Sequence, residues 1–202
     1  IANDDSVTTS NIVGITSLNI SSKAISDLTG LEDFTSLSVL YCYSNQLTSL
    51  DLSNNTSLTA LECYFNQITN LNLTQNIALT NLQCAQNSLT SLDVSQNTAL
   101  TQLGCEVNQL TSLDLRNGNN QNLLNFNVTG NPNLTCISVD DTAYSNANWL
   151  LIDAQHYFST NCSVPNSVQE IPHSISLYPN PTNENITISI ENFNGNIQTE
   201  VF

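Results

Sequence analysis

Six cysteines are the side chains of this chain best suited to chemistry, because thiols bind metals, form disulfides and act as nucleophiles. Cys42, Cys63, Cys84 and Cys105 follow one another at a constant 21-residue step. None of them has the C-x₂-C spacing of a zinc site, so we expect no bound metal. Side chains at one position of a stacked repeat point the same way, which suits disulfide geometry badly. The spacing predicts a buried ladder of reduced cysteines that pack as small apolar residues.

Cys136 and Cys162 lie outside this spacing. We predict a disulfide between them, which implies an oxidising compartment. The alternative is two unpaired thiols in a reducing cytosol. The loop between them holds bulky apolar residues that we expect to cover the end of the preceding core: Tyr144, Trp149, Leu150, Ile152 and Phe158.

The sequence contains no recognised set of catalytic residues. His156 and His173 are the only imidazoles, and neither recurs with a Ser or Cys partner. The sequence contains no G-x-S-x-G, H-E-x-x-H, P-loop or dinucleotide fingerprint. We therefore expect a protein that is not an enzyme.

Acidic residues recur at one further position, as Asp51, Asp93 and Asp114, with Asn72 interrupting the column. A column of carboxylates could attract calcium, and Asp140 with Asp141 offers a similar weak option. Turn formation and solvation are the simpler interpretation. We expect no cofactor, with calcium as the only candidate.

These spacings belong to a repeat that runs through most of the chain. Leucines or isoleucines recur with a 21-residue period in four consecutive units, each reading L-x-x-L-x-C-x-x-N-x-L-T-x-L-D-L-S-x-N-T-x. An earlier and slightly longer unit begins at Ile15, and a degenerate last unit begins at Leu123. The recurring asparagines are Asn45, Asn66, Asn87 and Asn108.

The repeat resembles the bacterial leucine-rich repeat, in the 21-residue, cysteine-containing form of the internalin J type of surface protein. The resemblance covers roughly residues 15–139 and implies a right-handed leucine-rich-repeat solenoid. In each unit the alternation around Leu40-Tyr41-Cys42 is that of a strand with one buried face. Stacked units would pair these strands into one parallel sheet on the concave face. We expect a buried asparagine ladder to satisfy backbone groups between coils, and short extended or 3₁₀ pieces on the convex side.

Outward positions of the predicted sheet form columns, and aromatic residues gather on two adjacent coils. We predict an exposed patch there, because tyrosine offers rigid contact area with a polar tip. The alternative is that strands simply favour aromatic residues. The candidate ligand-binding residues on the concave face are Tyr41, Tyr43, Glu62, Tyr64, Phe65 and Gln83.

Charge narrows the set of partners. Two basic residues stand against 17 acidic ones, for a formal net charge of -15. Such a surface repels phosphate backbones and anionic lipid, so we expect no nucleic-acid partner. No apolar run is long enough for a membrane span. Polar uncharged residues dominate the remainder, which is typical of an extracellular solenoid.

The repeat ends before a tail of different composition. Residues 163–173 contain Pro165 and Pro172 and read as a linker. The string L-Y-P-N-P-T followed by alternating Ile186–Ile190 resembles the start of the carboxy-terminal sorting domain of the type IX secretion system of Bacteroidetes, a small β-sandwich. The resemblance implies an exported protein whose precursor meets the type IX secretion machinery. Asp5-Ser6-Val7 and Asp141-Thr142-Ala143 resemble the O-glycosylation triplet of the same bacteria, with Ser6 and Thr142 as acceptors.

The predicted organisation has five parts. These are an N-terminal cap segment (1–14), the leucine-rich repeats (15–139), a disulfide-closed C-terminal cap (140–162), the linker (163–173) and a truncated sorting domain (174–202). We expect an extracellular or outer-membrane-surface module that binds a protein or carbohydrate ligand in adhesion. The alternative is a structural spacer or surface-layer component whose active part lies outside the fragment.

Overall fold

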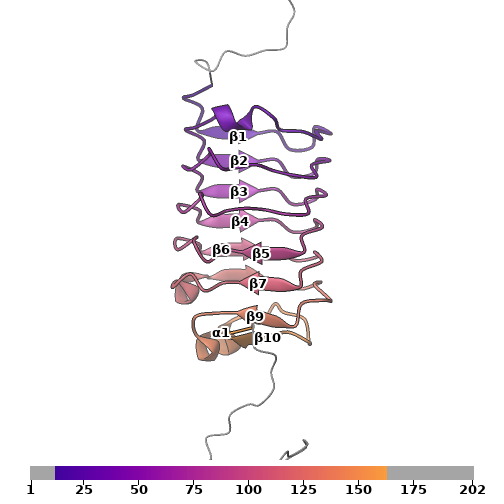
Figure 1. The fold of residues 1–202 in the computed structure, drawn as a ribbon, viewed down its shortest axis with the longest axis vertical. Helices are drawn as coiled ribbons and strands as arrows, with labels where there is room; N and C mark the ends of the chain where they lie inside the picture. Colours follow the sequence, from indigo (N-terminus) through magenta and orange to yellow (C-terminus); the bar gives the residue numbers. More distant parts are fainter. Residues whose placement is uncertain (1–11, 163–202) are drawn as a thin grey trace, which may run out of the picture. The chain divides into compact units, whose positions relative to one another are not determined.

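A computed structural model describes residues 12–162, which lie in the first of two compact units, Ile1–Asn166. Consecutive coils of backbone stack along the long axis of this unit (Figure 1). The expected cap residues before Ile12, the acceptor Ser6, His173, the linker and the sorting domain lie outside the described residues.

One parallel sheet holds the repeat strands. Its order is β1-β2-β3-β4-β6-β8, and each neighbouring pair is parallel. The middle residues of neighbouring strands are register partners. They are leucines from Leu18 in β1 and Leu40 in β2 onward, and Phe126 takes this position in β8. Its strands are β1 (Ser17–Asn19), β2 (Val39–Tyr41), β3 (Ala60–Glu62), β4 (Asn81–Gln83), β6 (Gln102–Gly104) and β8 (Asn125–Asn127). We call the outward side of this sheet the first-sheet face.

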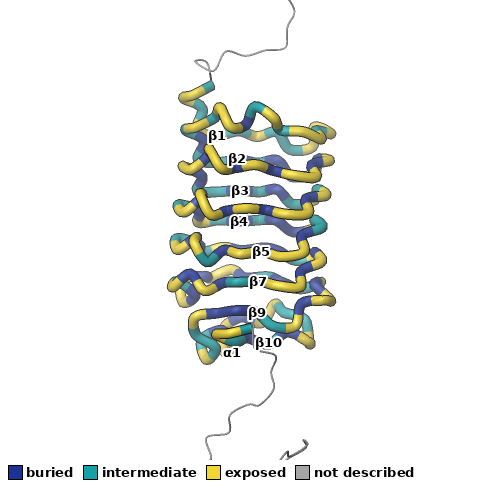
Figure 2. Tube along the Cα trace, in the orientation of Figure 1, coloured by how far each residue is buried: buried dark blue, intermediate teal, exposed yellow. Residues whose placement is uncertain are grey.

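The opposite side of the coils is more regular than the sequence predicts. The first coils run there as extended chain with one 3₁₀ turn, η2 (Leu31–Asp33), and the later coils pair into a second parallel sheet in the order β10-β9-β7-β5. Its strands are β5 (Ser91–Asp93), β7 (Ser112–Asp114), β9 (Cys136–Ser138) and β10 (Tyr157–Ser159). The two sheets enclose the core between them, and Figure 2 shows buried and exposed segments alternating along each coil.

The core is a set of rows, each made by one repeat position. Leucines of both sheets meet inside, and the four repeat cysteines are fully buried and free. At the same repeat position, Ile20 lies in the coil before Cys42, and the fully buried Val128 lies in the coil after Cys105. Burial raises the pKa of the Cys42 thiol to about 12, and it raises the pKa values of Cys63 and Cys84 well above the ordinary range. The thiols therefore stay protonated and act as apolar packing.

The repeat asparagines bridge each coil to the one before it. Asn66 Oδ1 accepts from Leu47 N at 3.0 Å, and its Nδ2 donates to the carbonyls of Cys42 and Cys63 at 3.1 and 3.0 Å. Asn131 continues the row in the degenerate last unit. Each amide satisfies backbone groups that the turn would otherwise leave unpaired inside the stack.

A second asparagine row lies on the other side of the coils. Asn76 is fully buried, and its Nδ2 donates to the carbonyls of Leu52 and Asn55 at 3.1 and 3.0 Å. The members of this row are Asn55, Asn76, Asn97 and Asn117. Their regular recurrence is visible in the N-T-x end of the repeat, but its structural role was not predicted.

Each coil leaves the first sheet through a residue with left-handed backbone. Ser44, Phe65, Gln86 and Val107 have φ between 50° and 55°, and Gly130 takes the equivalent place at 74°. A positive φ is costly for bulky and β-branched side chains. It persists because the stack holds the backbone on both sides, for example through Phe65 N donating to Ala85 O at 3.1 Å.

The last repeat and the cap depart from the regular period. The step from Leu103 to its register partner Phe126 is longer than one repeat, and the extra length is taken up at Gly118, with φ 73°, and the 3₁₀ turn η3 (Asn120–Asn122). Helix α1 (Thr142–Asn148) follows, and a disulfide joins Cys136 to Cys162.

Trp149 and Phe158 cover the end of the core as expected, and Tyr144 and Ile152 pack against it. The prediction for Leu150 is wrong, because its side chain is 79% exposed. Trp149 takes the inward place beside Phe126, with ring centroids 4.6 Å apart. The next residue of an extended chain then points to the outside.

Replacing Asn87 by alanine tests the asparagine row. Its Oδ1 accepts from Ile68 N at 2.9 Å, and its Nδ2 donates to Cys63 O at 3.0 Å. Asn87→Ala leaves these buried groups unpaired and should lower the free energy of unfolding by about 2 to 4 kcal/mol. Urea unfolding followed by circular dichroism measures this, with Asn70→Ala at an exposed position as the control. Equal stability of the two variants would contradict the role of the row.

Thiol labelling tests the cysteine row. Raised pKa values and full burial keep the four thiols protonated and out of contact with solvent at pH 8. The folded protein should react with Ellman's reagent at none of them, and the same protein in denaturant should release four equivalents. Fast labelling of the folded chain would show that the row is open.

Candidate functional site

The first-sheet face carries the outward side chains of six strands, and its central column is set by the strand register. Tyr41, Glu62, Gln83 and Gly104 are successive partners in that register. Strand alternation turns these side chains outward while the leucines before them point into the core. From Tyr41 to Gln83 the column changes from aromatic to acidic to amide, and Gly104, which has no side chain, separates Gln83 from Asn127 in β8.

Three aromatic rings beside this column form what we call the aromatic cluster: Tyr43, Tyr64 and Phe65. The rings of Tyr43 and Tyr64 stack with centroids 4.5 Å apart and planes 4° from parallel. The ring of Phe65 contacts that of Tyr64 edge-on, with ring centroids 5.7 Å apart, and Phe65 is 50% exposed. Its left-handed backbone turns the ring outward, so the cluster presents an apolar and polar surface to solvent.

The phenol of Tyr64 stays neutral in this setting. Its pKa is raised, first by desolvation and then by the neighbouring Tyr43 and Glu62. A neutral phenol remains a hydrogen-bond donor at the edge of the stacked rings. The cluster can therefore give a ligand both ring contact and a hydrogen bond.

The remaining residues of the predicted patch fall into two groups. Tyr41 and Glu62 are paired in register beside the aromatic cluster and are half-buried. Gln83 turns away from the cluster, because its Nε2 donates to Asn81 Oδ1 at 2.9 Å. Its side chain lies over Gly104 instead.

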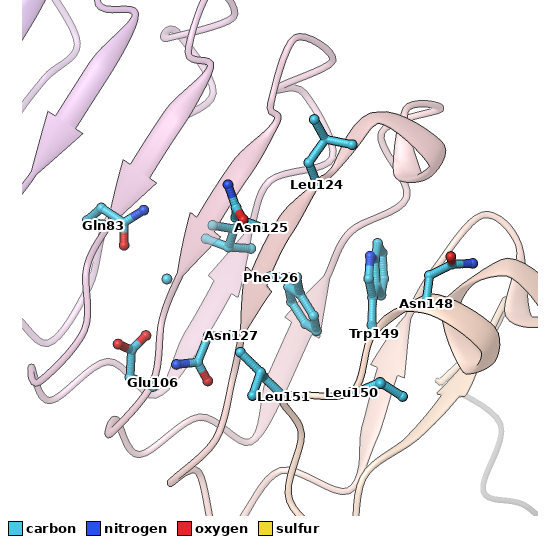
Figure 3. A pocket seen from close by; sticks show the side chains of 12 residues that line it. Gln83, Glu106, Leu124, Asn125, Phe126, Asn127, Asn148, Trp149, Leu150 and Leu151 are labelled. Carbon is cyan, nitrogen blue, oxygen red and sulfur yellow. The ribbon is translucent and has the colours of Figure 1, made fainter.

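A pocket lies further along the same face, where it meets the C-terminal cap. It has a volume of about 340 Å³ and is shown in Figure 3. Gln83, Gly104 and Glu106 form one side, the strand β8 forms the middle, and Asn148 to Leu151 form the other side. We call this the cap pocket.

The sequence analysis missed the cap pocket because no repeat position marks it. Three large apolar side chains around it are exposed: Leu124 by 77%, Leu150 by 79% and Leu151 by 56%. Two of these lie in the non-repetitive cap, whose path across the sheet edge follows from tertiary packing. The only feature of the sequence that could have indicated the pocket is Gly104, which has no side chain and follows Tyr41, Glu62 and Gln83 at the same repeat position.

Acidic residues on the second side of the coils make turns. Asp51, Asp93 and Asp114 each accept from the backbone N–H two residues ahead, at 2.9, 2.8 and 3.0 Å, and Asn72 does the same at 3.1 Å. Arg116 forms an ion pair with Asp114. Their oxygens are used by the backbone, as in Asx turns.

Asp140 and Asp141 also have structural partners. Asp140 accepts from Gly118 N at 2.8 Å, and Asp141 is the N-cap of α1, accepting from Ala143 N and Tyr144 N. Thr142 is the first residue of that helix and is half-buried. Within residues 12–162, no three His, Cys, Asp or Glu side chains gather in a way that could hold a metal ion.

His156 is buried in the cap and holds the turn that covers Asn131. Its Nδ1 accepts from Asp153 N at 3.1 Å, and its Nε2 lies 3.3 Å from Asn131 O. The Asp153 carboxylate accepts from Gly130 N and Asn131 N, both at 2.9 Å. Burial acts to raise the pKa of Asp153, but these two N–H groups and His156 outweigh it and lower the pKa.

No helix within the described part of the chain has the length and apolar character needed to cross a membrane. The in-register coils, inward leucines and asparagine rows define a leucine-rich-repeat solenoid.

Solved structures of bacterial repeat proteins are similar to this solenoid. The functional domain of InlJ from Listeria monocytogenes, which includes a cysteine ladder, is 41% identical over 65% of this chain and 31% of its own length, with a TM-score of 0.54. The internalin InlF from the same species is 27% identical over 68% of this chain and 45% of its own length, with a TM-score of 0.50. The protein is thus a leucine-rich-repeat protein similar to the internalins.

A leucine-rich-repeat protein of Leptospira interrogans shares the fold, at 24% identity over 72% of this chain and 37% of its own, with a TM-score of 0.56. The chain therefore spans less than half the length of these three proteins. No protein-family model and no curated protein matches the chain.

Protonation of Asp153 at low pH should destabilise the C-terminal cap. The pKa of its carboxyl is lower in the folded chain than its ordinary value of 3.8, so its contribution to stability is present above that value and is lost as the pH falls below it. Asp153→Asn should lower Tm at pH 7, and the difference from the unmodified chain should shrink below about pH 4. Differential scanning calorimetry from pH 7 to pH 2.5 measures this, with the exposed Asp33→Asn as control. A difference in Tm that does not depend on pH would contradict the assignment.

Proposed function

We propose that this chain is a non-enzymatic recognition module that binds a protein or glycan ligand through its first-sheet face. The observation that carries the proposal is the aromatic cluster, in which stacked Tyr43 and Tyr64 and the half-exposed Phe65 face solvent. Aromatic rings on a rigid support lose little conformational entropy on binding, and they dominate the energy of many interfaces.

The rigid support comes from the stack. The strands that precede the cluster residues, β2 and β3, pair in register, and Phe65 N donates to Ala85 O of the next coil. A ligand therefore meets a preorganised surface, which reduces the cost of binding. Glu62, in register with Tyr41, adds a carboxylate beside the rings.

The setting proposed for this function is the cell surface or the extracellular space. The disulfide Cys136–Cys162 favours an oxidising compartment. The resemblance of residues 174–202 to a type IX sorting domain supports export by that route, and Thr142 is a candidate for glycosylation at the start of α1. The similarity to internalins supports adhesion as the role of binding.

Array binding tests the proposal. The labelled protein should bind a member of a glycan or extracellular-protein array, and the double variant Tyr43→Ala with Tyr64→Ala should bind it at least about tenfold more weakly, since two anchoring rings are removed. Ile77→Ala, an exposed apolar residue outside the first-sheet face, should bind normally. Circular dichroism checks that the variants fold.

Two results would contradict the proposed function. One is full binding by the double variant, which would place recognition elsewhere. The other is a lack of any ligand for the unmodified protein on either array, which would favour a structural spacer.

A further inference from the structure

Two hydrogen-bond acceptors, one from Glu106 and one from Gln83, lie near each other in the cap pocket. Glu106 Oε2 is buried and has no hydrogen-bond partner among the described residues. It lies 3.1 Å from the point where a Cβ of Gly104 would stand, and Gln83 Oε1 lies closer still to that point. A carboxylate oxygen and an amide oxygen therefore lie near each other beside the backbone of Gly104.

No Lys or Arg side chain of residues 12–162 lies beside these oxygens. The chain contains only two basic residues, Lys23 and Arg116, and neither lines the pocket. Arg116 is held by Asp114 and by Thr160 O, outside the first-sheet face. An unpaired buried carboxylate oxygen is costly, and a cationic donor from a ligand would satisfy it.

The opposite side of the pocket is aliphatic. Leu124, Leu150 and Leu151 are exposed there, while the aromatic rings of Phe126 and Trp149 beneath them are buried. Exposed aliphatic side chains gathered beside a polar pocket are typical of an interface with another polypeptide. A sugar ring would find no accessible aromatic face to stack on.

We propose that the cap pocket binds a lysine or arginine side chain of a polypeptide partner, whose neighbouring apolar side chain packs on the three leucines. In this proposal the oxygens of Glu106 and Gln83 accept hydrogen bonds from the cationic head. Figure 3 shows Gln83 and Glu106 on one side of Phe126 and Asn127, and Trp149 and Leu150 on the other. This inference rests on the proposed recognition function and narrows its ligand to a protein with a basic and apolar contact sequence.

Gly104 is part of the site because its lack of a side chain leaves room for the Gln83 amide beside Glu106. A Cβ at this position would displace the Gln83 amide and crowd Glu106. The strand pairing of Gly104 with Asn127 fixes the distance between the acidic side and the cap. The net charge of -15 would attract a basic partner at long range, and added salt would weaken that attraction.

Methyl NMR of leucine-labelled protein tests the inference with a defined probe. Acetyl-Leu-Lys-Leu-amide should give saturable shifts of the Leu124, Leu150 and Leu151 methyl signals at up to about 10 mM peptide. The analogue with norleucine in place of lysine keeps the apolar stem and loses the charge, and it should bind at least about tenfold more weakly.

The matched variants are Glu106→Gln and Glu32→Gln. Each replaces a carboxylate by an amide of the same size, and Glu32 is an exposed residue of η2 that does not line the pocket. Glu106→Gln should weaken binding of the lysine peptide at least about tenfold, and Glu32→Gln should leave the affinity within about twofold. Unchanged dispersion of the methyl spectrum checks that both variants fold.

Equal affinity for the lysine and norleucine peptides, or no saturable shift, overturns the inference. So does full binding by Glu106→Gln. The double variant Tyr43→Ala with Tyr64→Ala should keep its affinity for the peptide, because these rings lie outside the pocket. If the protein binds the charged peptide but no ligand on the arrays, the function proposed for the aromatic cluster is wrong and the inference about the cap pocket stands. If it binds an array ligand but not the peptide, only the inference about the cap pocket is wrong.

Discussion

The hydrogen bonds that join each coil to the one before it are the interaction on which the structure depends. A single coil cannot bury its own leucines, and its two turns leave backbone N–H and C=O groups facing the interior. Asn66 and Asn76 show how both turns are satisfied, because each side-chain amide reaches the carbonyls of the preceding coil. The in-register stack then brings leucine onto leucine and thiol onto thiol.

Stacking also explains why the surface is suited to recognition. Parallel pairing places equivalent residues of neighbouring coils side by side, so two tyrosines at one repeat position become stacked rings. The same constraint holds Phe65 and Val107 in a left-handed backbone that their side chains disfavour. Side chains at that position consequently project to solvent, where Phe65 completes the aromatic cluster.

The two ends of the first-sheet face differ because the repeat stops at one of them. Within the repeat, an outward residue lies beside the same position of the next coil. At the cap, the Trp149 ring packs on Phe126, and Leu151 O accepts from Val128 N at 3.1 Å next to β8. The face therefore ends in a pocket bounded by sequence-distant residues, with Glu106 on one side and Leu150 on the other.

By itself the sequence determined the repeat, the parallel sheet, the buried row of cysteines and the first asparagine row, because each follows from one constant period. It also placed Tyr43, Tyr64 and Phe65 together, since adjacent coils align equal positions. Only the tertiary structure decided that the later coils pair into a second sheet, that Gln83 lies over Gly104 and that Leu150 is exposed. These features depend on how side chains of different coils pack and on the path of the cap, which no local pattern encodes.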